Sequence, residues 1–118
     1  MKTTQKHFQI FQQECQKWIN AWELNNWDIF YKVDTDKGTV AGIVTDIDGY
    51  VATIFFTGDW NNNVRPCNEE EIRLSAKHEV VHLLLGRLSD QARERFINKA
   101  EITEAEEELV RKLTKIIK

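Results

Sequence analysis

Residues 68–88 read NEEEIRLSAKHEVVHLLLGRL, and this stretch decides the fold. Asn68 is a good helix N-cap, and Glu71, three residues later, is the partner expected in a capping box. The three acids at 69–71 complement the positive end of a helix dipole. Apolar residues then recur on most sides of the helical wheel as far as Gly86, where we expect the helix to end. Such a pattern predicts a helix buried inside the fold.

Within this helix, residues 78–82 read His-Glu-Val-Val-His. Two histidines four positions apart lie on one helix face, one turn apart, so both imidazoles can bind the same zinc ion. Glu79 points about 100° further around the helix axis, where it misses the metal but can hold a water as a general base. Because the surrounding sequence is apolar, we expect His78 and His82 to lie inside the fold beside a cleft. The alternative is a pair of histidines with a structural role alone.

A catalytic zinc ion needs a third protein ligand. No histidine follows His82, and the remaining one, His7, is far upstream. Residues 101–118 are predicted to form a helix with an apolar stripe centred near about 20° on a helical wheel, and Glu106 falls at about 40°. A carboxylate on an apolar face needs a positive partner, so Glu106 is the expected third ligand.

Two alternatives to this interpretation of Glu106 stay open. Glu107 lies at the edge of the same stripe and is the second choice of ligand. Thr103 could instead be an N-cap, in which case Glu106 would close a capping box and need no metal.

The 78–82 motif, followed 24 positions later by Glu106, resembles the gluzincin pattern of zincin metallopeptidases. The small size and the Trp/Phe-rich start leading to LNNWDIFYKV are also similar to minimal zincin domains associated with phages and prophages. The resemblance implies that His78 and His82 are zinc ligands, Glu79 the general base and Glu106 the third ligand. The setting of Glu106, AEEEL at 105–109, departs from the Asn-Glu-x-x-Ser-Asp setting of larger gluzincins.

The rest of the chain predicts an α+β fold of zincin-like type, in one domain covering residues 1–118. A helix is expected over 4–23, because large apolar side chains recur there at spacings of three and four: Phe8, Phe11, Cys15, Trp18 and Trp22. Ser89-Asp90 is expected to cap a short helix over 91–97 before the final helix.

Three strands are expected over 28–33, 39–45 and 50–57, where β-branched and aromatic residues gather. The turn residues at 34–38 and 46–49 favour two hairpins, hence an antiparallel meander. We take 50–57 as an edge strand beside the motif helix, able to pair with an extended peptide; a central place in the sheet is the alternative.

Composition and charge bear on the partners and the cellular setting expected for the chain. The chain has 118 residues and a net charge of -3, with scattered basic residues, so a nucleic-acid partner is not expected. No signal peptide or membrane-spanning stretch is recognised, and the expected setting is the cytoplasm, where Cys15 and Cys67 would be free thiols. The oligomeric state is not predicted.

The function expected from the sequence is that of a zinc-dependent peptidase acting on peptide or protein substrates. The alternative is a zincin-like interaction module in which zinc only stabilises the fold. A donor that would stabilise the oxyanion is not assigned; the candidates are Tyr31, Tyr50, His7 and Arg87.

Overall fold

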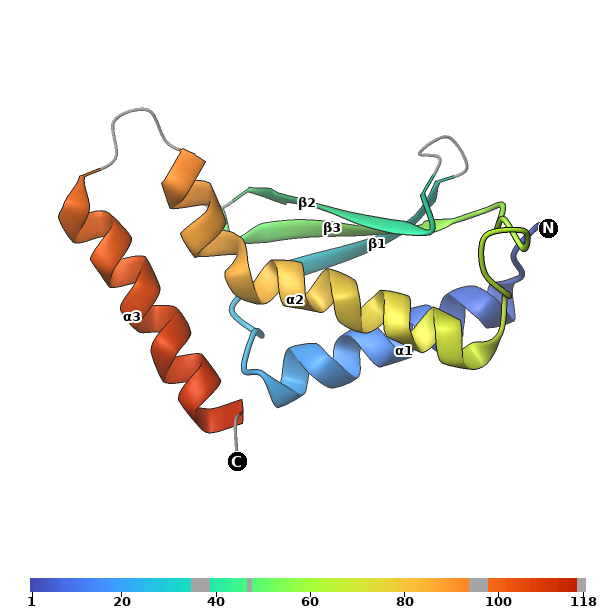
Figure 1. Ribbon diagram of the computed structural model, residues 1–118, viewed down its shortest axis with the longest axis horizontal. Coiled ribbons are helices and arrows are strands. Elements are labelled where there is room, and N and C mark those ends of the chain that lie inside the picture. The colour runs from blue at the N-terminus through green and yellow to red at the C-terminus, as the bar shows by residue number, and fades with distance from the viewer. Residues whose placement is uncertain (35–38, 47, 94–97, 117–118) are drawn as a thin grey trace.

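Within the residues that the structure describes, three helices and a three-stranded mixed sheet form an α+β fold, and the α+β class is the one that the sequence predicts. The computed structural model describes residues 1–34, 39–46, 48–93 and 98–116. The elements follow in the order α1 (Gln5–Ala21), β1 (Asp28–Asp34), β2 (Ala41–Asp46), β3 (Val51–Thr57), α2 (Glu69–Arg93) and α3 (Lys99–Ile116). Figure 1 shows α1 and α2 beneath one face of the sheet and α3 beyond the far end of α1.

The first helix begins at a capping box that uses a histidine. The Thr4 hydroxyl accepts from the backbone N–H of His7 at 3.2 Å, and His7 Nδ1 accepts from the backbone N–H of Thr4 at 3.1 Å. Phe11, Cys15 and Trp22 of the predicted stripe are buried, which confirms that this face of α1 belongs to the core.

The sheet has the strand order β1-β3-β2, with β1 parallel and β2 antiparallel to β3. The predicted meander is therefore wrong. β2 and β3 pair antiparallel, as the prediction of a hairpin at 46–49 requires, although residue 47 lies outside the described residues. β1 and β2 are not neighbours, so these two strands do not form the hairpin expected at 34–38, of which residues 35–38 are likewise outside the described residues. The central strand is β3 and not an edge, because β1 and β2 pair with its two sides.

The core lies between the sheet and the helices. Alternate residues of β3, Ala52, Ile54 and Phe56, are fully buried on the helix-facing side. The opposite face leaves Phe30 and Val44 exposed. Trp60, just after β3, is also fully buried, and its ring lies 6.2 Å from that of Phe56.

The helix that carries the 78–82 motif is longer than predicted. Asn68 caps it, since its side chain accepts from the Glu71 backbone N–H at 2.9 Å. The helix then passes through Gly86 and continues through residues 89–93, so the predicted end and the separate helix starting at 91 are both wrong. Gly86 is buried against the Trp27 ring, and this packing favours continuation over the local preference of glycine to end a helix. Residues 94–97 of the predicted short helix are not among those described.

The last helix begins at Lys99, capped by Asn98. The Asn98 side chain accepts from the Glu101 backbone N–H at 2.9 Å and donates to the Glu101 carboxylate at 3.1 Å. The prediction that Thr103 could be the N-cap is therefore wrong, and Glu106 closes no capping box.

Helix α3 packs against α2, and among its described residues Ala105 alone is buried. At its other end, Lys112 donates to the Glu23 carbonyl at 3.0 Å, and Lys115 pairs with the Glu23 carboxylate at 2.8 Å. No helix in the described part of the chain is long and apolar enough to cross a membrane.

Candidate functional site

The face of α2 that packs on the core differs from the predicted one. Its buried residues recur at spacings of three and four, and they include two polar side chains: Ile72, Ser75, Ala76, Glu79, Val80, Leu83 and Gly86. His78 and His82 lie off this stripe and are exposed, so the expectation that they sit inside the fold is wrong. Leu74 and Val81, two of the apolar residues on which the prediction of a buried helix depends, are exposed as well.

The two histidines nevertheless lie together as their spacing predicts. Their Nε2 atoms are 3.2 Å apart, and their ring planes meet at 76°. Two nitrogens bound to one tetrahedral zinc ion at about 2.0–2.1 Å would be separated by about 3.3 Å. The observed separation therefore fits a shared zinc ion, for which the exposed rings leave access. A direct hydrogen bond between the two rings, one as donor and one as acceptor, is the metal-free alternative.

Glu79 occupies the buried side of the same helix and is 6% exposed. Burial raises the pKa of its carboxyl above the ordinary value, while the nearby His82 and His78 oppose this effect. A buried carboxylate that lies near two imidazoles able to share a cation suits the role of a general base.

The structure does not bring the predicted third ligand to the histidine pair. Glu106 and Glu107 are both exposed, and the described residues contain no group of three or more His, Cys, Asp or Glu that could hold a metal ion. The apolar setting expected for Glu106 is wrong, because Ile102 and Val110, which placed the predicted stripe over it, are themselves exposed. The more buried face of α3 runs instead through Ala105, Leu109, Leu113 and Ile116.

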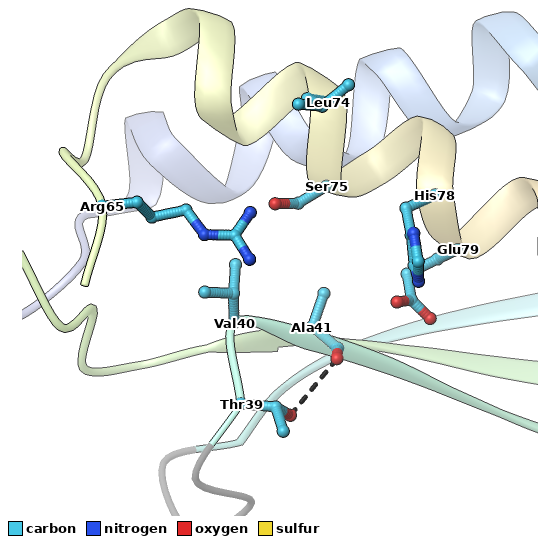
Figure 2. Close-up of a pocket in the computed structure, with 8 residues that line it drawn as sticks. All are labelled: Thr39, Val40, Ala41, Arg65, Leu74, Ser75, His78 and Glu79. Carbon is cyan, nitrogen blue, oxygen red and sulfur yellow. Dashed lines mark hydrogen bonds between the residues drawn. The ribbon is translucent and has the colours of Figure 1, made fainter.

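A pocket of about 340 Å³ lies between α2 and the beginning of β2. Glu79 and His78 line it together with Arg65 and Ser75, which the sequence does not single out as site residues. The full lining consists of Thr39, Val40, Ala41, Arg65, Leu74, Ser75, His78 and Glu79. Figure 2 shows Glu79 and His78 projecting from α2 toward Ala41, with Arg65 at the opposite end. Ser75 could have been found from sequence, because it lies one turn before Glu79 on the same helix face. Arg65 gives no such signal.

The residues considered as oxyanion donors lie elsewhere. The Tyr31 hydroxyl donates to the Gln16 side chain at 3.4 Å, and the Tyr50 ring packs 5.1 Å from that of Trp27. His7 caps α1, and none of these three residues lines the pocket. The side chain of Arg87 is outside the described part of the structure.

A scan against protein-family models, a search of curated proteins and a search of solved structures each found no match.

Proposed function

We propose that this chain is a zinc-dependent peptidase whose active site is the pocket between α2 and β2. His78 and His82 would bind the zinc ion, and Glu79 would act as the general base. The observation that carries the proposal is the 3.2 Å separation of the two Nε2 atoms, next to a buried carboxylate that lines the pocket. An acid held at this position has no use in a site that only stabilises the fold, which favours catalysis over the interaction module.

A zinc ion at this pair would lower the pKa of a water and polarise the scissile carbonyl. Glu79 would accept the proton of the attacking water and return it to the leaving amine. The Glu79 side chain is 6% exposed and lines the pocket, so its carboxylate would face the attacking water.

The substrate is proposed to bind in extended form along β2. This strand pairs with β3 on one side, and within the described sheet its other side has no strand neighbour. Since the pocket reaches from Glu79 to Thr39–Ala41 at the start of β2, a peptide added to this edge would pass in front of the carboxylate.

Glu106 remains the proposed third ligand, with Glu107 as the second choice. In the described residues neither forms a metal-binding group with the two histidines, so a shift of α3 toward the histidines would be required. Comparing the zinc affinity of Glu106→Gln and Glu107→Gln tests the choice of third ligand separately. Zinc binding should weaken only in the variant that loses the carboxylate ligand.

The central test measures zinc stoichiometry and affinity by competition with a chromogenic chelator, together with hydrolysis of a peptide library. His78→Ala and His82→Ala should each lose tight zinc binding, while His7→Gln, the matched control, should keep it. Glu79→Gln should retain zinc and lose hydrolysis. Wild-type protein that takes up no zinc would contradict the proposal, and zinc uptake without any Glu79-dependent hydrolysis would favour the interaction module.

A further inference from the structure

One end of the pocket carries the Arg65 guanidinium, on a segment whose backbone is bonded to the core; the side chain itself is 43% exposed. The Arg65 carbonyl accepts from the indole N–H of Trp60 at 3.0 Å, and Trp60 is fully buried. The Arg65 guanidinium points into the pocket (Figure 2). Its Nη1 lies 3.7 Å from a carboxylate oxygen of Glu71, which is an ion pair too long for a good direct hydrogen bond. Donors of the guanidinium therefore remain available to a ligand.

An unpartnered hydroxyl faces the same space. Ser75 is 7% exposed, and its buried Oγ has no hydrogen-bond partner in the described part of the structure. Figure 2 shows this hydroxyl directed toward the Arg65 side of the pocket. A buried polar atom without a hydrogen-bond partner lowers the stability of the fold, and a ligand that accepts a hydrogen bond from the Ser75 hydroxyl would remove this penalty.

We infer that Arg65 and Ser75 form a subsite for a carboxylate of the peptide substrate, so that the enzyme selects peptides bearing a carboxylate near the scissile bond. This inference rests on the proposed peptidase function. A guanidinium binds both oxygens of a carboxylate through parallel N–H donors, and the Ser75 hydroxyl adds a third donor. An acidic side chain and a free C-terminus supply the same chemistry.

The charges along the pocket also give the substrate a direction. The Glu79 carboxylate at one end repels an anion, and the Arg65 guanidinium at the other end attracts it. Val40 and Ala41 line the wall between them and offer apolar contact to the intervening part of the peptide. The carboxylate would therefore bind at the Arg65 end while the scissile bond lies at Glu79.

The test measures peptide binding by calorimetry in the zinc-loaded Glu79→Gln variant, which should bind substrates without cleaving them. Three peptides of one length are compared: a neutral peptide with a free C-terminus, an amidated peptide with one internal aspartate, and an amidated neutral peptide. At least one carboxylate peptide should bind about 10- to 100-fold more tightly than the amidated neutral one. The peptide that binds more tightly than the amidated neutral one identifies the source of the carboxylate, an acidic side chain or a free C-terminus.

Substitutions in the same background assign the effect to the subsite. Arg65→Gln should abolish the preference, Arg65→Lys should retain part of it, and Ser75→Ala should reduce it several-fold. Arg111→Gln, an exposed arginine on α3, is the matched control and should change nothing. Equal binding of all three peptides, or a preference that survives in Arg65→Gln with a native circular dichroism spectrum, would overturn the inference.

The two proposals fail in different ways. If zinc binds to the wild type and peptides are cleaved without any effect of Arg65→Gln, the carboxylate subsite is refuted and the peptidase stands. If zinc does not bind but the Arg65-dependent preference persists in metal-free protein, the subsite is supported and the peptidase is refuted.

Discussion

Replacing Gly86 by alanine should stabilise the protein, because α2 runs through this position without a break. A glycine inside a helix costs about 0.8–1.0 kcal/mol relative to alanine. A Cβ added at Gly86 would lie 3.6 Å and 3.8 Å from two atoms of the Trp27 ring, an ordinary van der Waals contact. Burying one methyl group there adds up to about 0.8 kcal/mol. The free energy of unfolding should therefore rise by about 1–1.5 kcal/mol.

For a domain of this size, that gain corresponds to an increase in Tm of roughly 4–6 °C. The assay is thermal unfolding by circular dichroism on metal-free protein in the presence of a chelator. Gly42→Ala on β2 is the comparison, because a Cβ there meets no atom within 4 Å. It removes the backbone-entropy cost of glycine without adding a contact, so its Tm should rise less than that of Gly86→Ala. A fall in the Tm of Gly86→Ala would show that the helix is interrupted there or that Trp27 leaves no space for a methyl group.

Three further predictions concern the core and its thiols. Trp60→Ala should lower the free energy of unfolding in urea by about 3–5 kcal/mol, since the ring is fully buried; an unchanged midpoint would contradict this packing. Ellman's reagent should modify Cys67 in the native protein and reach Cys15 only after unfolding, because Cys15 is buried and its thiol has a raised pKa. Two reactive thiols in the native state would refute this. The folded protein keeps Cys15 protonated at pH values where the unfolded chain ionises it, so stability should hold up to about pH 9 and decline above it. Cys15→Ala should flatten that decline, and an equally steep decline in the variant would assign it to other groups.

Helices could be predicted from the sequence because their signals are local. The stripe through Phe11 and Cys15 and the cap at Asn68 each involve residues within a few positions of one another, and the structure confirms both. The continuation of α2 past Gly86 could not be predicted, because it depends on contact with Trp27, which lies far away in the sequence.

The strand order has no local signal. Alternation of side chains identifies the buried face of β3, but it does not say which strand lies beside it. β1 pairs parallel with one side of β3, and β2 occupies its other side. This order depends on how the whole sheet packs against the helices. A short connection rich in turn residues therefore suggested a hairpin that does not form.

The candidate site was only partly predictable for the same reason. The spacing of His78 and His82 fixes their relative position, and the Nε2 separation agrees with it. The face on which they lie was mispredicted, because Leu74 and Val81 are apolar yet exposed. Arg65 lies in the segment before α2, and its place in the pocket depends on how that segment packs against the rest of the fold. A periodic pattern in the sequence does not predict such packing.

The limited packing of α3 affects which part of the protein unfolds first. Ala105 is the only described residue of α3 that is buried, and the ion pair between Lys115 and Glu23 is exposed to solvent. Amide hydrogens of α3 should therefore exchange with the solvent sooner than those of α1 or β3, through partial openings that leave the sheet intact. Glu106 moves with α3, so the acid proposed to complete the metal site belongs to the least firmly held helix of the fold.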